Sequence, residues 1–353
     1  MRSKHRLVFL GTPEVAAGVL EAILDAADAP DASFEVAAVV SQPGRPRGRG
    51  RSKAKDATPP PSPVAETALA RGVPEDRVLC PVKANEPAFL DELRAMAPDL
   101  MVTAAYGNFL PQKFLDIPRL GTLNIHPSLL PAYRGAAPVQ RALEAGVEVT
   151  GVSVAYTVLA MDAGPVLRRA TRPLVGDEKH PELLTELFAT GTKLLLDALP
   201  EVWAGDAAFA KGTTPQEELG EIIHAAKVVP DEAWLNFTDP GVDAATHHNK
   251  VRGFAGWPGT KSKFTLRKEG EEEGKEVVLK VITTRVGSDD GGSDAPSAGG
   301  VVEVSKTCLR VPCAGGGWLE VTELQPPGKK PMRAGDFANG LKGSVLAVAP
   351  IGE

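Results

Sequence analysis

The sequence predicts an α/β domain with a mostly parallel sheet, followed by a smaller β-barrel domain. Two observations lead to this prediction. From residue 7 to residue 203, short apolar runs alternate with amphipathic segments, which is typical of strands joined by helices in β-α-β units. Beyond residue 260 the segments are short, alternate in polarity and are separated by turn-forming residues, which is typical of a small barrel.

The composition is that of an ordinary globular protein. The 353 residues are 43% hydrophobic and carry a net charge of -6, so the chain as a whole is not a basic nucleic-acid coat. Three scattered cysteines (Cys80, Cys308 and Cys313) form no disulfide framework and indicate a reducing compartment. No histidine or cysteine cluster has metal-ligand spacing, so we expect no metal. No apolar run approaches the roughly 20 residues of a membrane span.

The first β-α-β unit opens the chain. Residues 7–10 form an apolar run that predicts a buried strand, and Gly11 turns it into a helix at residues 14–26. Residues 34–40 are the next predicted strand, which makes a parallel sheet the expected arrangement. The turn after the first strand is not a dinucleotide-binding fingerprint, because it lacks the second glycine that would let a pyrophosphate approach.

A basic segment follows at residues 41–63. Between residues 45 and 55 a basic residue stands at every second position: Arg45, Arg47, Arg49, Arg51, Lys53 and Lys55. In an extended chain these charges would lie on one side at about 6.5–7 Å spacing, close to the phosphate spacing of a nucleic-acid strand. A solvated charge run explains the segment alone equally well, although the acidic background makes such a concentration more informative.

The middle of the chain continues the parallel pattern. The predicted elements are helices at 63–71 and 86–96, a short strand near residue 78, and buried strands at 99–105 and 121–126. Ligands in open parallel sheets bind beyond the carboxyl ends of the strands. The loop Tyr106-Gly107-Asn108-Phe109-Leu110-Pro111 should therefore share one cleft with residues 124–131.

Asn124 and His126 lie two residues apart in the strand at 121–126, so their side chains project to the same side. An amide can donate hydrogen bonds to an oxyanion, and an imidazole can move a proton near neutral pH. Acyl transfer needs both capacities together. An isolated N-x-H tripeptide is, however, a weak motif. Its asparagine and histidine are more often two polar residues on the solvent-exposed face of an edge strand.

A helix at 137–145 and a strand at 152–158 lead to Asp162. The Ala-Gly-Pro sequence after it predicts a turn that holds Asp162 at a strand-to-strand connection. Taken alone, an aspartate that bonds its own backbone in a turn is the commoner case. Residues 181–203 have helical periodicity and close the first domain, and residues 205–221 are a predicted linker.

The second domain contains a predicted helix at residues 242–252. Its predicted strands are residues 264–267, 277–282, 300–304, 309–312 and 319–324. Residues 287–300 (GSDDGGSDAPSAGG) are of low complexity and predict a disordered hairpin tip.

Assembled, these stretches resemble the methionyl-tRNA formyltransferase family from residue 7 to about residue 342. The matching stretches include FLGTPE, SQPGRPRGRG, AAYGNFLP, NIHPSLLPAYRGAAPVQRA, MDAG, GWPGT and PPGKKPM, and their wording is most similar to organellar forms of plants and algae. The resemblance implies a Rossmann-like formyltransferase domain at residues 5–204, the linker, and an OB-like tRNA-binding β-barrel at residues 222–353.

The resemblance also implies an activity, namely transfer of the formyl group of 10-formyltetrahydrofolate to the α-amino group of methionyl initiator tRNA. The catalytic residues would be Asn124 as oxyanion donor, His126 as proton relay and Asp162 as the hydrogen-bonded partner that orients His126. The folate pocket would be Tyr106, Gly107, Leu110, Pro111, Ser128, Leu129, Leu130 and Pro131. The tRNA contacts would be Arg45, Arg47, Arg49 and Arg51, with Arg49 matching an arginine that contacts the acceptor end.

The sequence departs from the family pattern after Asp162, where Ala163 replaces a frequent Thr and Pro165 a frequent Asp. The basic segment is also longer than usual. Alternatives are a formyltransferase for a small amine, a formyl-folate hydrolase and a catalytically inactive RNA-binding module. The intact catalytic trio argues against the last of these. A monomer is expected, in the mitochondrial matrix or plastid stroma of a eukaryote or in the cytoplasm of a bacterium.

Overall fold

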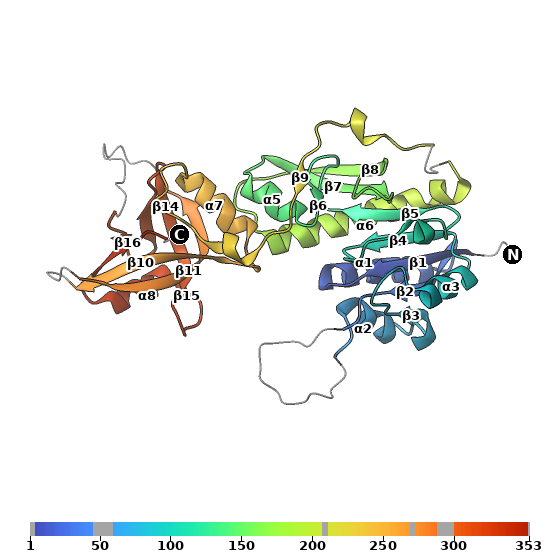
Figure 1. Ribbon diagram of the computed structural model, residues 1–353, viewed down its shortest axis with the longest axis horizontal. Coiled ribbons are helices and arrows are strands. Elements are labelled where there is room, and N and C mark those ends of the chain that lie inside the picture. The colour runs from blue at the N-terminus through green and yellow to red at the C-terminus, as the bar shows by residue number, and fades with distance from the viewer. Residues whose placement is uncertain (1–3, 45–58, 207–210, 269–272, 288–299, 352–353) are drawn as a thin grey trace. The chain divides into compact units, whose positions relative to one another are not determined.

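The computed structural model describes residues 4–44, 59–206, 211–268, 273–287 and 300–351 (Figure 1). The chain forms two compact units. The first unit comprises Met1–Gly135, Thr150–Arg172 and Leu184–His224, and the second comprises Ala136–Val149, Pro173–Leu183 and Ala225–Glu353. Two segments that precede residue 204 therefore pack with the second unit.

The first unit is built on a seven-stranded sheet in the order β3-β2-β1-β4-β5-β7-β8. The strands are β1 (His5–Gly11), β2 (Phe34–Val40), β3 (Val78–Leu79), β4 (Leu100–Ala104), β5 (Thr122–His126), β7 (Val149–Tyr156) and β8 (Val166–Pro173). The first five pair in parallel, and β7 runs antiparallel to β5. The prediction of a mostly parallel sheet is confirmed, whereas β8 was not predicted.

Except for the short helix Gln112–Leu115, which was not predicted, the helices of the first unit agree with the predicted ones within two residues at each end. They are α1 (Glu14–Asp28), α2 (Pro63–Ala70), α3 (Pro87–Ala95), the short α4 (Gln112–Leu115) and α6 (His180–Ala204), whose first turn groups with the second unit. The start of α2 follows from its sequence, because Ser62 accepts a hydrogen bond of 3.1 Å from Ala65 N and Pro63 occupies the first helical position.

The core of the first unit explains why the central strands are apolar. All five residues of β4 are buried, and Val8 and Leu10 of β1 are fully buried beside them. Burying an aliphatic side chain of this kind contributes about 1.5–3 kcal/mol. This rigid sheet fixes the positions of the loops that leave its carboxyl edge.

The second unit is an antiparallel, nearly closed barrel, which confirms the predicted architecture. Its strands are β10 (Thr260–Lys268), β11 (Lys275–Val286), β12 (Glu303–Val304), β13 (Leu309–Pro312), β14 (Trp318–Gln325), β15 (Met332–Arg333) and β16 (Ser344–Val348), in the order β12-β13-β14-β11-β10-β16 with β15 beside β14. A bridge between Val301 and Ala347 brings the two ends of this order together. Of these strands, β15 and β16 were not predicted.

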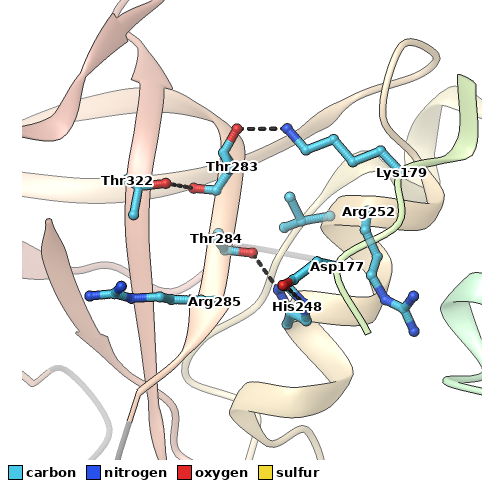
Figure 2. Close-up of a pocket in the computed structure, with 9 residues that line it drawn as sticks. Asp177, Lys179, His248, Arg252, Thr283, Thr284, Arg285 and Thr322 are labelled. Atoms are coloured by element: carbon cyan, nitrogen blue, oxygen red, sulfur yellow. Dashed lines mark hydrogen bonds and ion pairs between the residues drawn. The ribbon is translucent and has the colours of Figure 1, made fainter. Parts of the chain in front are cut away.

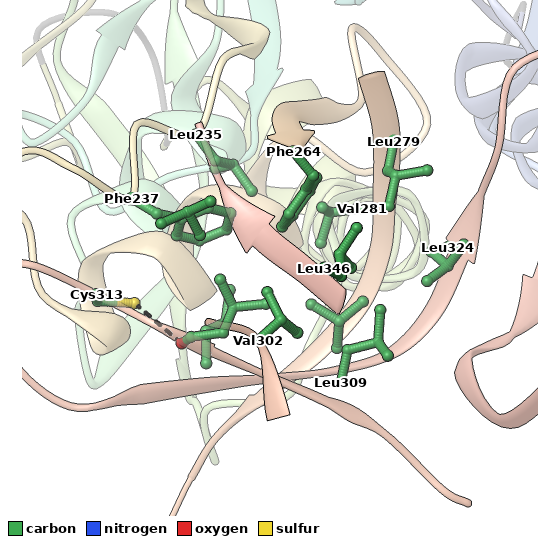
Figure 3. Close-up of a cluster of buried hydrophobic side chains, with 14 of the residues drawn as sticks. Leu235, Phe237, Phe264, Leu279, Val281, Val302, Leu309, Cys313, Leu324 and Leu346 are labelled. Atoms are coloured by element: carbon green, nitrogen blue, oxygen red, sulfur yellow. Dashed lines mark hydrogen bonds between the residues drawn. The ribbon is translucent and has the colours of Figure 1, made fainter. Parts of the chain in front are cut away.

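Three helices accompany the barrel: α5 (Pro138–Glu144), α7 (Ala244–Gly253) and the unpredicted α8 (Ala334–Leu341). The barrel core contains Phe237, Phe264, Leu279 and Leu346, which gather inside the strands in Figure 3. Most of the low-complexity segment lies outside the described residues. Within the described part of the chain, none of the helices has both the length and the apolar composition that crossing a bilayer requires.

Candidate active site

Asn124 lies on β5 at the carboxyl edge of the sheet, next to Thr103 on the parallel strand β4. The Thr103 hydroxyl donates a hydrogen bond of 2.7 Å to Asn124 Oδ1. Because this bond occupies the amide oxygen, it leaves the two N–H groups of the amide for other partners. The side chain is therefore oriented as a hydrogen-bond donor, which is the polarity that a developing oxyanion needs.

His126 is the last residue of β5, and its side chain is almost fully enclosed. Its Nε2 lies 3.0 Å from the Tyr133 carbonyl oxygen. A carbonyl oxygen only accepts, so this hydrogen bond requires the proton on Nε2. The ring is thus held in one tautomer by a main-chain group, and the neutral ring has its lone pair on Nδ1.

Asp162 faces the other ring nitrogen, since its Oδ2 lies 3.9 Å from His126 Nδ1. This separation is within ion-pair range but about 1 Å longer than a typical hydrogen bond. The structure therefore brings the two side chains together, as expected, but without the predicted hydrogen bond. Instead, Asp162 Oδ2 accepts a hydrogen bond of 2.9 Å from Gly135 N.

The turn that carries Asp162 is strained and tightly held. Asp162 has a φ of 49°, in the left-handed region that costs an L-residue about 1–2 kcal/mol. Gly164 lies so close to the end of β7 that a Cβ at this position would be 1.8 Å from Tyr156 O. On the far side of the turn, Tyr156 N donates to Pro165 O at 3.0 Å. The turn is therefore fixed by its neighbours, not by local preference.

Gln216 is a contributor that the sequence did not indicate. It lies in the short 3-10 helix Gln216–Glu218, within the segment predicted as a linker, and is 1% exposed. Its Nε2 donates to Asp162 O at 2.8 Å and to Gly164 O at 2.7 Å. Two such bonds at about 0.5–1.5 kcal/mol each are enough to offset the strain at Asp162. No periodicity or motif marks a lone glutamine in a polar stretch, so sequence reasoning missed it.

The segment around Gln216 is packed onto the first unit. Thr214 and Val166 exchange two main-chain hydrogen bonds of 2.9 Å, which add this segment to the start of β8. Further along, Ile223 O accepts from Arg134 N at 2.9 Å. The described part of the predicted linker therefore belongs structurally to the first unit.

The Tyr106 loop follows β4 at the same edge of the sheet. Tyr106 O accepts hydrogen bonds from Thr12 Oγ1 at 2.9 Å and from Gln42 Nε2 at 3.0 Å, which joins the ends of β1, β2 and β4. The Tyr106 ring is buried, and this burial raises the pKa of its hydroxyl. Gly107 has a φ of +80° and passes close to Gln42, whereas Phe109 is 69% exposed. Phe109 is thus the apolar surface that this loop presents to solvent.

The residues after His126 are more enclosed than a ligand-lining role would suggest. Ser128 is fully buried, and its hydroxyl donates to Ala132 O at 2.6 Å. Leu130 is also buried and packs with Ala155 and Val166. The remaining members, Leu129 and Pro131, are half-buried and buried, respectively. In this structure the side chains of this stretch mainly fix the loop, so a ligand would meet its main chain and rim.

Arg45, Arg47, Arg49 and Arg51, which were predicted to contact tRNA, lie outside the described residues. The two ends of that segment are described and lie close together. A Cβ at Gly44 would be 1.8 Å from Pro60 O, and the hydroxyls of Ser41 and Ser62 are 2.5 Å apart. The segment therefore leaves and re-enters the first unit at one place, beside the carboxyl end of β2.

A cavity of about 270 Å³ lies within the second unit, between α7, the barrel and the residues before α6 (Figure 2). Lys179 Nζ donates to Thr283 Oγ1 at 2.7 Å, and His248 pairs with Thr284 Oγ1 at 2.9 Å and with Gly176 O at 2.9 Å. Burial lowers the pKa of His248, in keeping with these neutral contacts. Lys179 and His248 therefore bond two adjacent threonines of β11 at this cavity.

Among the described residues, no group of metal ligands lies at the carboxyl edge of the first sheet or at the cavity of the second unit. Among residues 4–44, 59–206, 211–268, 273–287 and 300–351, no three His, Cys, Asp or Glu side chains are grouped so that they could hold a metal ion. The site at the carboxyl edge of the first sheet is therefore described by an amide donor, an imidazole and a carboxylate. Such a set can stabilise an oxyanion and move a proton.

The chain matches two protein families, described as formyl transferase (residues 5–199) and formyl transferase, C-terminal domain (residues 227–342). It is 39% identical to a methionyl-tRNA formyltransferase of Myxococcus xanthus, over 96% of both chains. It is 37% identical to one of Pseudomonas paraeruginosa, over 99% of this chain and 100% of the relative. The fold is similar to an N-formyltransferase of Helicobacter canadensis, with a TM-score of 0.59, 13% identity and coverage of 91% of this chain and 99% of that one.

Proposed function

The chain belongs to the methionyl-tRNA formyltransferase family, and on that premise we propose how its residues carry out the reaction. The protein transfers the formyl group of 10-formyltetrahydrofolate to the α-amino group of methionyl initiator tRNA, which provides N-formylmethionyl-tRNA for translation initiation. The observation that carries the mechanism is that Asn124 and His126 lie two residues apart on β5, with Asp162 Oδ2 3.9 Å from His126 Nδ1.

In the proposed mechanism, the neutral α-amine attacks the formyl carbon and a C–N bond forms. The formyl oxygen becomes an oxyanion, and Asn124 donates to it through the N–H groups that Thr103 leaves available. Removal of one such donor typically costs about 3–4 kcal/mol of transition-state stabilisation. The tetrahedral intermediate then collapses as the bond from the formyl carbon to the folate nitrogen breaks.

His126 moves the proton in this scheme. With Nε2–H bonded to Tyr133 O, the lone pair on Nδ1 takes the proton of the attacking amine. The imidazolium that forms is then paired with Asp162, across the 3.9 Å gap. The same proton passes to the folate nitrogen as it leaves, so His126 ends the cycle neutral and no net charge accumulates.

We propose that the folate binds between the Tyr106–Pro111 loop and the Ser128–Pro131 stretch. The main chain of the first loop is fixed through Tyr106 O, and Phe109 offers an exposed ring for an apolar contact. The rigidity of both stretches limits the ordering cost of binding. Here Gly107 and Pro111 would form one rim and Leu129 the other, while the buried side chains of Leu110 and Pro131 would support them.

We propose that the basic segment holds tRNA phosphates. Its two ends meet beside the loop of Tyr106, because Gln42 contacts Tyr106 O and Gly44 lies against Pro60. Phosphate contacts of this kind position a nucleic acid without reading its sequence. We propose that residues 222–353 are the tRNA-binding domain and that residues 5–204 are the catalytic domain.

We also propose a monomer in a reducing compartment, where bacterial or organellar translation takes place. The three cysteines, which are free thiols in this structure, support the reducing compartment. Native mass spectrometry and thiol titration of the purified protein would check the two statements independently.

One experiment tests the proposed site. Labelled 10-formyltetrahydrofolate is incubated with methionyl initiator tRNA, with small amines or with buffer alone, and the label is followed. We expect transfer to tRNA, with turnover reduced more than about a hundredfold in Asn124→Ala, His126→Ala and Asp162→Asn. His5→Ala is the matched control, because His5 lies at the amino end of β1. Activity of His126→Ala within tenfold of wild type would exclude the proton relay.

A further inference from the structure

Gln216 uses every hydrogen-bonding group of its side chain at the catalytic turn. Its two N–H groups donate to Asp162 O and Gly164 O, at 2.8 and 2.7 Å, and its Oε1 accepts from Arg134 Nε at 2.8 Å. We infer that Gln216 is a positioning residue for formyl transfer, which holds the Asp162 turn so that its carboxylate faces His126. This inference rests on the proposed roles of Asp162 and His126.

The chemistry of the three partners requires an amide. Two carbonyl oxygens need donors, and a guanidinium needs an acceptor, so the partner must carry two N–H groups and one oxygen. A carboxylate at this position would place its charge against two carbonyl oxygens, and an apolar side chain would leave all three groups without this partner. Glutamine supplies the full set, and its burial keeps water from replacing it.

Gln216 holds the Asp162 carboxylate from two sides. On one side it fixes the main chain of Asp162 itself, in the left-handed conformation. On the other side it fixes Arg134, whose neighbour Gly135 donates the 2.9 Å hydrogen bond to Asp162 Oδ2. Loss of Gln216 would therefore release both the turn and the Arg134–Gly135 segment that aim this carboxylate, while leaving Asn124 and the Tyr106 loop in place.

The test is a double-mutant cycle between Gln216→Met and Asp162→Asn. Gln216→Met keeps the length and apolar volume of the side chain but removes all three hydrogen bonds. We expect it to lower kcat about tenfold to a hundredfold, with the KM values for folate and tRNA unchanged within about threefold. Because Gln216 acts through Asp162, the double variant should have a kcat within about threefold of Asp162→Asn alone.

Gln140→Met is the matched control. Gln140 is also buried, and its Nε2 donates a hydrogen bond of 2.8 Å to Trp257 O. Unlike Gln216, which lies in the first unit, Gln140 and Trp257 both lie in the second unit. This variant should lose stability and keep its kcat within about threefold at a temperature where both variants are folded. A purely structural Gln216 would behave in the same way as Gln140.

The outcomes are distinguishable. If Asp162→Asn retains wild-type turnover, the proposed site is wrong, and the inference goes with it. If Asp162→Asn is inactive but Gln216→Met keeps its kcat, or if the two effects multiply in the double variant, the positioning role of Gln216 is wrong and the proposed site stands. A rise in both KM values at unchanged kcat would also overturn the positioning role.

Discussion

The hydroxyl of Thr103 donates a 2.7 Å hydrogen bond to the side-chain oxygen of Asn124, across the parallel pair β4 and β5. An asparagine side chain can present either its oxygen or its N–H groups to a cleft. This contact selects the N–H groups, because the oxygen is turned toward the neighbouring strand. The donor that the proposed mechanism needs is thus chosen by a residue on another strand.

We therefore expect Thr103→Val to lower kcat about fivefold, since a net hydrogen bond of roughly 1 kcal/mol no longer holds the amide. Thr103→Ser keeps the hydroxyl and should retain most of the activity. Single-turnover formyl transfer at saturating folate measures the effect. A valine variant within twofold of wild type would mean that the amide is oriented by something else.

Gly164→Ala should disrupt the catalytic turn. Its Cβ would lie 1.8 Å from Tyr156 O, a main-chain atom of β7 that cannot move aside cheaply, so the turn itself must shift. We expect turnover to fall by more than about tenfold because the adjacent Asp162 moves with the turn. Gly18→Ala is the control, since nothing lies within 4 Å of that position and alanine favours helix α1.

The basic segment gives a prediction about salt. Replacing Arg45, Arg47, Arg49 and Arg51 together by Ala should weaken tRNA binding and reduce the magnitude of the slope of log affinity against log salt by up to about 3–4, at roughly 0.7–0.9 per phosphate contact. Arg49→Ala alone should mainly raise the KM for tRNA.

Arg71→Ala is the matched control for the basic segment. Arg71 donates a hydrogen bond of 2.7 Å to the Asp25 carboxylate, so its charge is already paired within the protein. Filter binding of tRNA between 50 and 200 mM salt, a range in which such slopes are well measured, would follow the effect. An unchanged slope in the fourfold variant would mean that the segment is only a solvated charge run.

His247 should make the second unit acid-sensitive. It is 2% exposed and packs beside Phe237 with ring centroids 4.8 Å apart, and burial lowers its pKa from 6.5 to about 4. Between pH 6.5 and pH 4, His247 is protonated in the unfolded chain but stays neutral in the folded unit. Protonation therefore favours the unfolded state, and the stability of the unit falls as the pH falls below 6.5. The loss from this residue is about 2 kcal/mol between pH 7 and pH 5.

Urea unfolding at pH 7 and at pH 5, followed by tryptophan fluorescence, measures that loss. His247→Phe keeps a ring beside Phe237 but has no titrating group, so its stability should change less than that of the wild type over the same interval. The difference between the two proteins isolates His247, since His180 and His248, whose pKa values are also lowered by burial, are common to both. Equal losses in the two proteins would contradict the assignment.

The local elements were largely predictable. Strand β2 has the predicted limits, and α1, α2 and α3 differ from them by at most two residues at either end, because apolar periodicity is written directly in the sequence. Strand β8 was missed because its burial alternates beyond the first two residues and it carries three arginines, so it resembles a polar loop. What makes it a strand is its place in the sheet beside β7.

The candidate site divides in the same way. The sequence by itself determined which residues bring an amide, an imidazole and a carboxylate, because Asn124, His126 and Asp162 stand in recognisable local patterns. Only the tertiary structure decided what orients them. Thr103 and Gln216 contact this site from positions 21 and 54 residues away in the chain. Such contacts depend on strand register and on buried main-chain carbonyls, and neither leaves a periodic trace in the sequence.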